Sequence, residues 1–449
     1  MIFFFRLYYL KMSFINQLST EQQNAFRMYE QGYNIFITGP GGSGKTHFIQ
    51  YLYKNCPPDK NIQVCALTGC AAILLQCDAV TVHSWSGIGI GNGDMKDILK
   101  KIKKNKDAKQ RWISTTTLII DEISMMSMEM LDMLDYVGRN IRKKDAPWGG
   151  IQLVFSGDFF QLPPFNSEKF CFESPLWNVL FPHNCLFEFK KIFRQKDNVF
   201  QQILNEIRVG NVKEQSEEIL KKYIGRTCHT KDANFTKILP LRKNVDDINQ
   251  YHYSKIDDKE ISYKMFLDTN TAHYYTSNQL IPPQKNLKPS SYALQKEIEK
   301  LIKENGITKN LTLKKNCPVM CLSNLDIENG ICNGSQGVII DTTSKGPEVR
   351  FQNGIQMVIP MLYYQSKDYP SIVVGQFPLC LSWAMTIHKI QGTTLDAAEI
   401  DIGGQIFAFG QSYVALSRLK SLDGLFLRAF SRQKIKAHPK VIQFYKQFA

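Results

Sequence analysis

One eight-residue segment near the start of the chain restricts what this protein can fold into. Residues 39–46 read Gly-Pro-Gly-Gly-Ser-Gly-Lys-Thr, a complete G-x-x-x-x-G-K-[ST] pattern. The apolar run 35–37 before it predicts a buried strand, and residues 47–52 predict the start of a helix. Between a strand and a helix, such a loop turns its backbone N–H groups toward phosphates. The chain is therefore predicted to bind a nucleoside triphosphate through Gly39, Gly41, Gly42, Ser43, Gly44, Lys45 and Thr46.

Two acids at the end of a later apolar run extend this prediction from binding to hydrolysis. Lys45 is expected to reach the β- and γ-phosphates, and the Thr46 hydroxyl to hold Mg²⁺. The run 118–120 ends in Asp121 and Glu122. Asp121 is expected to help to hold Mg²⁺, and Glu122 to orient and deprotonate the attacking water. An Asp-Glu pair alone also fits a solvated surface, but its place after a buried strand favours the catalytic interpretation.

Gln161 is a candidate sensor of hydrolysis. It follows the apolar run 152–156 in a polar turn. Its amide can donate to a γ-phosphate and accept from water. The alternative is a turn held by Asp158 and the prolines that follow.

The alternation of apolar runs and helical stretches predicts a parallel α/β region from about residue 13 to residue 190. Its apolar runs are 35–38, 62–67, 118–120 and 152–156. A second α/β region is expected to begin near Ile192 and to return in the runs 379–387, 398–402 and 424–428.

The sequence between these α/β parts has a different texture. Residues 251–316 are polar and rich in lysine, with a helical pattern at 295–302. Residues 319–364 show short alternating strands separated by Asn-Gly and Gly-Pro turn signals. This pattern predicts a small antiparallel β barrel inserted into the second α/β region.

Composition points to an anionic partner. Lys and Arg number 55 against 41 Asp and Glu, which gives a net charge of +14. Such a balance favours nucleic acid, although a lysine-rich surface from an AT-biased genome would look the same. The 11 cysteines include no C-x-x-C pattern, which predicts reduced, buried thiols rather than a metal site.

The apolar N-terminus, residues 1–11, is too short to span a bilayer and has no small-residue cleavage site. It contains no acid, so a weak organelle-targeting signal and a true start at Met12 both stay open. No membrane partner is expected, and the chain is predicted to be soluble and intracellular.

Seven further segments, in order, resemble one family. The chain is similar to superfamily 1B DNA helicases of the PIF-one type (petite integration frequency), which are related to RecD. The matching segments are 18–22, 68–72, 81–89, 148–164, 192–195, 382–396 and 413–418. Two residues depart from the family pattern: Ile390 stands where Ser is usual, and Trp148 where Phe is usual.

The resemblance implies two RecA-like P-loop NTPase domains with parallel sheets, and a small SH3-like β-barrel insertion in the second. The expected divisions are an N-terminal extension (1–17), RecA-like domain 1A (18–190), the first part of domain 2A (191–250), an accessory domain 2B (251–364) and the second part of domain 2A (365–449).

The resemblance also implies an ATP-hydrolysing DNA helicase that needs ATP and Mg²⁺. Gln22 would recognise the adenine edge, and Gly392 would lie at the nucleotide. Efficient phosphoryl transfer needs positive charge on the transferred group. Arg194 and Arg418 are the candidates, and the alternative for either is a surface ion pair of little value.

The partners implied by the resemblance are single-stranded and forked DNA. The protein is expected to translocate 5′ to 3′ along single-stranded DNA and to unwind duplex DNA in replication, repair or recombination. The expected DNA contacts are Thr68, His83, Trp85, Thr386, His388 and Lys389. A core position for Trp85 and a structural role for His388 stay open. The free protein is expected to be a monomer, in the nucleus or mitochondrion if cellular and at the host-cell replication site if viral. The alternatives are an ATPase that remodels protein–DNA complexes without strand separation, and a non-catalytic single-strand-binding protein.

Overall fold

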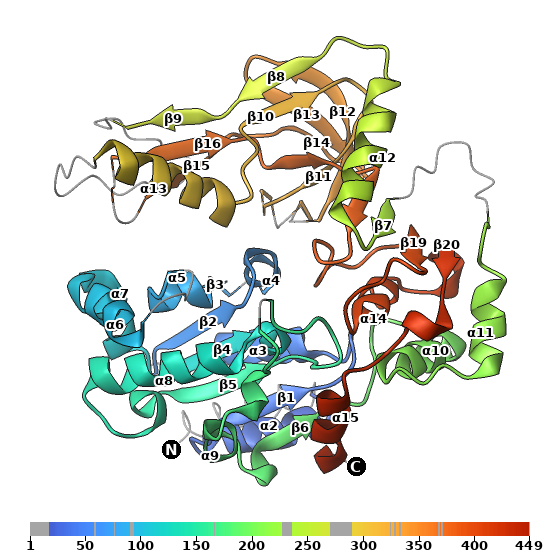
Figure 1. The fold of residues 1–449 in the computed structure, drawn as a ribbon. Coiled ribbons are helices and arrows are strands. Elements are labelled where there is room, and N and C mark those ends of the chain that lie inside the picture. The colour runs from blue at the N-terminus through green and yellow to red at the C-terminus, as the bar shows by residue number, and fades with distance from the viewer. Residues whose placement is uncertain are drawn as a thin grey trace, which may run out of the picture. The chain divides into compact units, whose positions relative to one another are not determined.

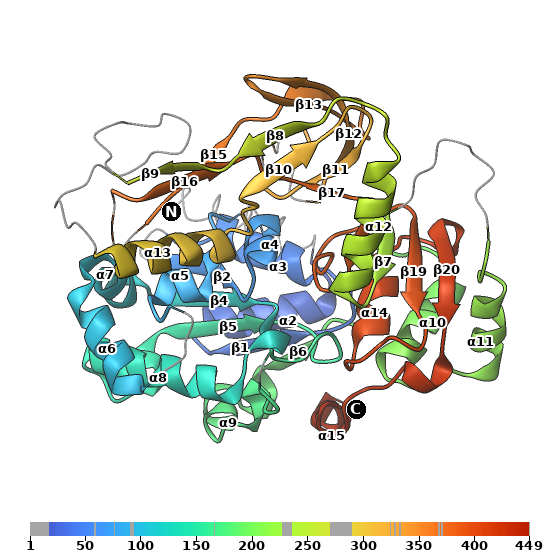
Figure 2. The ribbon, with the colours of Figure 1, turned by 45° about the horizontal axis from the view of Figure 1, so that its top comes forward.

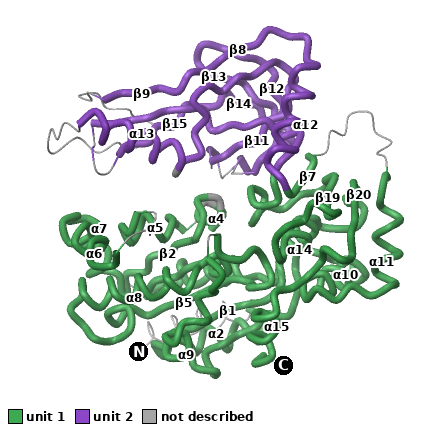
Figure 3. Tube along the Cα trace, viewed as in Figure 1, with its two compact units in different colours: residues 1–240, 386–449 green, residues 241–385 purple. Residues whose placement is uncertain are grey.

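The computed structural model describes residues 18–448, except 58–59, 76, 90–93, 166, 227–235, 270–289, 324, 327–328, 332–333, 367–368 and 370. The expected N-terminal extension, 1–17, lies outside this range. The chain forms two compact units (Figure 3): unit 1 comprises Met1–Pro240 and Thr386–Ala449, and unit 2 comprises Leu241–Met385.

A six-stranded parallel sheet forms the first part of unit 1 (Figure 1). Its strand order is β3-β2-β4-β5-β1-β6. The strands are β1 (Ile35–Thr38), β2 (Ile62–Ala66), β3 (Val80–Thr81), β4 (Thr117–Asp121), β5 (Gln152–Ser156) and β6 (Leu186–Glu188). The four apolar runs predicted for this region are all strands of this sheet.

Helices cover both faces of the sheet because successive strand residues point to opposite sides. Leu118 and Ile120 lie in one buried cluster, whereas Ile119 lies in the other. The first cluster is covered by α5 (Val82–Ser86), α6 (Met95–Lys104), α7 (Lys106–Ser114), α8 (Met128–Arg142) and α9 (Leu176–Leu180). The second is covered by α2 (Thr20–Glu30), α3 (Lys45–Lys54) and α4 (Gly69–Leu74).

A second parallel sheet lies in the same unit. Its strands β7 (Lys237–Leu239), β19 (Ala398–Ile402) and β20 (Leu425–Phe430) pair in that order. The helices α10 (Asn198–Arg208), α11 (Glu214–Lys221) and α14 (Gln411–Leu416) lie beside it, as both views show (Figures 1 and 2).

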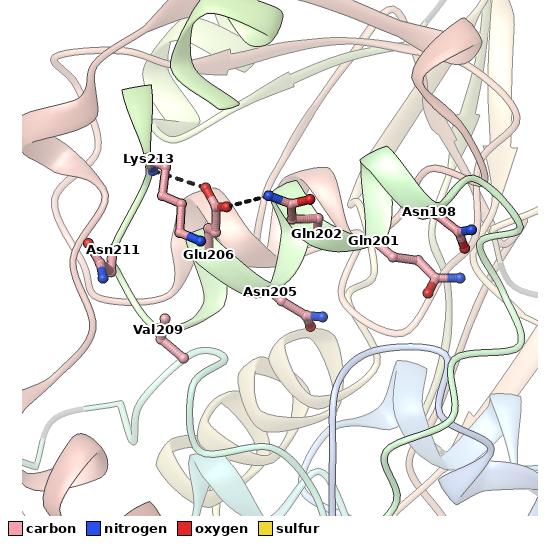
Figure 4. A pocket seen from close by; sticks show the side chains of 8 residues that line it. All are labelled: Asn198, Gln201, Gln202, Asn205, Glu206, Val209, Asn211 and Lys213. Atoms are coloured by element: carbon pink, nitrogen blue, oxygen red, sulfur yellow. Dashed lines mark hydrogen bonds between the residues drawn. The ribbon is translucent and has the colours of Figure 1, made fainter. Parts of the chain in front are cut away.

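Helix α10 has two distinct sides. Phe200, Ile203, Leu204, Ile207 and Arg208 recur at helical spacing and are buried. The polar side lines a surface pocket (Figure 4), in which Gln202 Nε2 donates to Glu206 Oε1 and Lys213 N donates to Glu206 Oε2. No phosphate-loop residue lines this pocket, so it is separate from the site described below.

The prediction that the run 379–387 belongs to the second α/β region was wrong for the first half of the run. Strand β17 (Leu379–Leu381) pairs antiparallel with β11 (Pro318–Cys321), inside unit 2. The next strand, β18 (Ala384–Thr386), begins only after Ser382 and Trp383. An apolar run shows that a segment is buried, but not which sheet it joins.

Unit 2 contains the antiparallel strands predicted for the insertion. A five-stranded sheet has the order β14-β13-β12-β11-β17. Its hairpins join β12 (Gln336–Thr343) to β13 (Gly346–Phe351), and β13 to β14 (Gln356–Val358). The remaining pairs use β8 (Ile261–Lys264), β9 (Phe266–Asp268), β10 (Asn310–Leu313), β15 (Leu362–Gln365) and β16 (Val373–Gln376). Two helices, α12 (Arg242–Ser254) and α13 (Ser291–Glu304), complete the unit, and α13 contains the helical pattern predicted at 295–302.

Both departures from the family pattern are buried apolar side chains. Trp148 is enclosed in the first cluster at a left-handed φ of 52°, and its backbone N–H donates to Asp135 Oδ1 at 2.7 Å. Ile390 is also fully buried. Each replacement therefore fills space within unit 1, and neither removes a group from the site.

Candidate functional site

The phosphate loop lies between β1 and α3, as predicted. Gly42 and Gly44 have left-handed φ values of 84° and 86°. A Cβ on Gly42 would lie 2.5 Å from Arg194 Cβ, so only glycine fits there without displacing a neighbour. Helix α3 begins at Lys45, and Gly44 supplies no side-chain cap. The N–H groups of its first turn therefore remain available to an anion.

Lys45 is folded back on its own loop. Its Nζ donates to the carbonyls of Gly39 and Pro40, at 2.6 and 3.0 Å. Burial lowers its pKa, while the nearby charges of Asp158, Asp121 and Glu122 act in the opposite direction. The ammonium group thus lies among carboxylates and can exchange two carbonyl partners for phosphate oxygens.

Asp121 ends β4 in a buried position, and Glu122, the next residue, is half-buried. Burial raises the pKa of Asp121, and burial together with the charge of Asp121 raises that of Glu122. Glu122 has a left-handed φ of 54°, an unusual conformation for a residue with a side chain. Gln391 Nε2 donates to Glu122 Oε2 at 3.1 Å, so a side chain beyond the first sheet holds this carboxylate.

Arg194 and Arg418 meet at Ser417. Arg194 Nη1 donates to the Ser417 carbonyl at 2.9 Å, and Arg418 Nη2 donates to Ser417 Oγ at 2.8 Å. Arg418 is 2% exposed, and burial with the nearby Arg194 lowers its pKa. Glu122 attracts both guanidinium groups. Two cations and the carboxylate are therefore gathered beside the phosphate loop, and Arg418 is not a surface ion pair.

Several buried polar atoms around the loop have no protein partner among the described residues. They are Ser43 Oγ, Gln161 Oε1 and Gln195 Oε1. Such atoms are rare in folded proteins unless a ligand or water satisfies them. This supports the placement of Ser43 and Gln161 at the nucleotide.

Gln22 braces the phosphate loop. Its Oε1 accepts from Ser19 N, and its Nε2 donates to the Gly44 carbonyl at 3.3 Å. The structure thus brings Gln22, which was expected to recognise the adenine edge, into contact with the loop that binds the phosphates. Gly392, which has a left-handed φ of 86°, follows the Gln391 that holds Glu122.

The residues present fit a magnesium ion held largely by phosphates. Among the described residues, no group of three or more His, Cys, Asp or Glu could hold a metal alone. Mg²⁺ typically uses one or two carboxylates, substrate phosphates and water. Asp121 beside a phosphate loop that ends in Thr46 provides this donor set.

Of the expected DNA contacts, five are at least partly exposed. Thr68 and His83 lie in the first α/β part, while Thr386, His388 and Lys389 follow the point where the chain returns from unit 2. Burial lowers the pKa of both His83 and His388. These side chains are accessible to a ligand.

Trp85 was predicted to contact DNA, but it lies in the core. Its side chain is 0% exposed and packs against Trp112, with ring centroids 4.5 Å apart. The structure therefore contradicts its prediction as a DNA contact, and the core position that the sequence left open is what is found. Arg111 also has a structural role, because its Nε donates to the Trp85 carbonyl.

Sequence reasoning missed two members of the site. Tyr413 accepts from the Gly41 N–H at 2.7 Å, and Gln391 holds Glu122. Both lie inside segments already noted for the family resemblance, and that was the available signal. Their partners lie 372 and 269 residues away, so no local pattern reveals them.

The two parallel sheets, the phosphate loop and the paired arginines define a class of protein, the RecA-like P-loop NTPases. Comparison with known proteins gives the particular family. The family described as "PIF1-like helicase" matches residues 17–218, and "DNA helicase Pif1, 2B domain" matches residues 297–341.

The "ATP-dependent DNA helicase Pif1" of Bdellovibrio bacteriovorus is 32% identical over 96% of this chain and 92% of its own length. "ATP-dependent DNA helicase PIF1" of Xenopus laevis is 32% identical over 96% of this chain, which spans 64% of that relative. The crystal structure of Pif1 helicase from Candida albicans matches with a TM-score of 0.81 and 32% identity, over 96% of this chain and 99% of that one. The chain belongs to the PIF1-like helicase family.

A further solved relative contains ligands. The crystal structure of Pif1 helicase from Bacteroides in complex with ADP-AlF3 and ssDNA has a TM-score of 0.70 and 28% identity, and the match covers 96% and 97% of the two chains. The two α/β parts of the present chain carry the RecA-like folds expected from its sequence. The antiparallel strands of unit 2 are consistent with a 2B domain.

Proposed function

We propose that this chain is an ATP-dependent DNA helicase that moves 5′ to 3′ along single-stranded DNA and separates duplex strands. The observation that carries the proposal is the gathering of Glu122, Arg194 and Arg418 beside the phosphate loop. Loop and carboxylate belong to the first sheet, whereas Arg418 follows α14 of the second. A site built from two α/β parts can couple nucleotide turnover to their relative motion. The bound ssDNA of the Bacteroides relative supports DNA as the track.

The residues divide the chemistry among them. The loop N–H groups and Lys45 bind the phosphates, and Thr46 and Asp121 would hold Mg²⁺. When bound, Mg²⁺ supplies positive charge to the phosphate oxygens. Glu122, held by Gln391, orients water and accepts its proton.

The remaining polar groups act on the transferred phosphate. Gln161 contacts the γ-phosphate and the water through an amide that has an unpaired buried oxygen. Arg194 and Arg418 stabilise the charge that develops during transfer, while Gln22 recognises adenine and Gly392 lies close to the nucleotide.

DNA binding uses the accessible candidates on both α/β parts. Thr68 and His83 grip the strand from the first part, and Thr386, His388 and Lys389 from the second. The net charge of +14 favours an anionic track. The free protein is a monomer that engages single-stranded and forked DNA during replication, repair or recombination. It acts wherever that DNA is processed, in a cell or at a viral replication site. No described helix is long and apolar enough to span a membrane.

Strand displacement tests the proposal. Duplexes with either a 5′ or a 3′ single-stranded tail are mixed with ATP and Mg²⁺, with Lys45→Ala as the control. We expect unwinding only from the 5′-tailed duplex, and none by Lys45→Ala. Unwinding only from the 3′ tail would contradict the direction. ATP hydrolysis that single-stranded DNA does not stimulate would favour an ATPase that remodels protein–DNA complexes.

A further inference from the structure

The last helix described, α15 (Pro439–Tyr445), packs on the first sheet, whose strands lie far from this helix in the sequence. Helix α15 lies beside β1 and β6 (Figure 1). Together with the short turn after it, α15 places Phe444 and Phe448 against Phe36 of β1, with ring centroids 6.0 and 6.4 Å apart. Phe444 also packs against Phe159 at 5.2 Å. This aromatic packing holds the next residue, Tyr445, beneath the nucleotide site.

The Tyr445 hydroxyl contacts two segments of that site at once. On one side it is hydrogen-bonded to Thr38 Oγ1, directly before the first glycine of the phosphate loop. On the other it accepts from Phe159 N at 3.2 Å and donates to Asp158 Oδ1 at 3.3 Å. Asp158 and Phe159 begin the turn that carries Gln161. One hydroxyl therefore joins the base of the phosphate loop to the base of the turn that contains the proposed γ-phosphate contact.

Arg208 adds the second α/β part to this network. At the end of α10, its Nε and Nη2 donate to the two oxygens of Asp158 at 2.9 and 3.0 Å. Its guanidinium lies over the rings of Phe160 and Tyr445, at 4.7 and 5.1 Å. Asp158 is 0% exposed, and a bidentate arginine is the partner that such a buried carboxylate requires.

We propose that Tyr445 is a positioning residue for ATP hydrolysis, which acts by fixing the turn 158–161 against Thr38. Together with Arg208, it passes a displacement of α10 to Gln161. The proposal rests on the helicase function proposed above. If the hydroxyl only satisfied buried polar atoms, its loss would lower stability without changing the chemical step.

The test is Tyr445→Phe, which keeps the ring stacked on Phe160 and removes only the hydroxyl. The matched control is Tyr253→Phe, which removes a hydroxyl bonded to Glu260 in unit 2. We measure DNA-stimulated ATP hydrolysis and the melting temperature. The hydroxyl makes three hydrogen bonds, and the net value of one alone corresponds to about a fivefold change, so we expect kcat to fall at least about fivefold in Tyr445→Phe, with KM for ATP changed less than about twofold. The control is expected to keep its kcat.

A double variant tests the coupling. Because Thr38→Val removes the same hydroxyl contact from the other side, Tyr445→Phe combined with Thr38→Val should be about as slow as the slower single variant. Unchanged kcat in Tyr445→Phe, an equal loss in Tyr253→Phe, or fully additive losses would each overturn the inference. A wild-type protein without DNA-stimulated hydrolysis would instead refute the proposed function.

Discussion

Glu122 occupies its position at a cost to the fold. Its backbone has a φ of 54°, and its half-buried carboxyl is largely withdrawn from water beside Asp121. Strained, buried charges of this kind persist at functional sites because the surrounding structure holds them. Substitution of Glu122 can therefore measure both the free energy that its position costs the fold and its contribution to catalysis.

We predict that Glu122→Gln abolishes hydrolysis, by a factor of about 10² or more, and stabilises the free protein at pH 7. Burial raises the folded-state pKa of Glu122, so the carboxyl destabilises the fold above its unfolded-state value of 4.5. The stabilisation by Gln should therefore be present at pH 7 and disappear near pH 4. Melting temperatures at both pH values, with and without the substitution, test this. An equal shift at both pH values would contradict it.

Gln391 offers a pH test of the base itself. A base works only when ionised, so activity is lost as pH falls through the pKa of Glu122 in the bound complex. The hydrogen bond from Gln391 lowers that pKa, against the upward effect of burial. Gln391→Leu should therefore move the acid limb of the kcat profile to higher pH. The exposed Gln202, on the polar side of α10, also donates to a carboxylate, that of Glu206, and gives the control Gln202→Leu. An unchanged acid limb in Gln391→Leu would argue that Glu122 is not the base.

At the scale of elements, the phosphate loop is restricted by both conformation and space. Gly42 and Gly32 both have left-handed φ values, 84° and 88°, but only Gly42 lacks room for a Cβ. Comparing alanine substitutions at Gly42 and Gly32 therefore separates the effect of backbone conformation from the effect of limited space.

Gly32→Ala should cost about 1 kcal/mol of stability and leave nucleotide affinity unchanged, because the strain is local. Gly42→Ala adds a clash with Arg194 Cβ, 2.5 Å away, which must displace the loop or the arginine. We expect at least about a tenfold loss of nucleotide affinity in Gly42→Ala alone. Titration with a fluorescent nucleotide measures it, and equal affinities in the two variants would refute the argument.

Trp85 tests the distinction between core and interface. As a fully buried ring against Trp112, it should act on stability. Trp85→Ala is expected to cost about 3–5 kcal/mol, and Trp85→Phe clearly less. Urea unfolding gives both values. Without urea, at a temperature at which Trp85→Phe is folded, the affinity of this variant for single-stranded DNA should match that of the wild type. A large loss of affinity would show that Trp85 contributes to DNA binding.

Local patterns predicted the elements whose formation depends on neighbours in sequence. The strand, loop and helix around residues 39–46 and the hairpins of β12 to β14 have their own turn and periodicity signals. The pairing of β17 with β11 was missed, because choice of partner is a property of the whole sheet. The Asp158–Arg208 pair and the Tyr445–Thr38 contact span 50 and 407 residues, so no sequence window contains them.

At the scale of the whole molecule, a motor needs its charge-stabilising groups on a different part from its phosphate loop. Arg418 fulfils this: it follows α14, its Nε donates to the Val414 carbonyl, and it is attracted by Glu122 of the first sheet. Arg428 gives a contrasting case, since it is 47% exposed and pairs with Glu399 at 3.5 Å. Such surface pairs contribute little.

We therefore predict that Arg418→Ala lowers kcat for ATP by about 10³, the effect of removing an arginine that stabilises the transferred phosphoryl group. Nucleotide affinity should change far less, because the loop N–H groups and Lys45 remain. Arg428→Ala should keep normal kcat. Since the Arg418 site is buried, Arg418→Lys gives a second variant that keeps the charge; without the planar fork, it should still be severely slowed. Single-turnover hydrolysis with saturating DNA isolates the step. If both Arg418 variants kept kcat within tenfold, Arg418 would not stabilise the transferred phosphoryl group, and hydrolysis could not depend on closure through this residue.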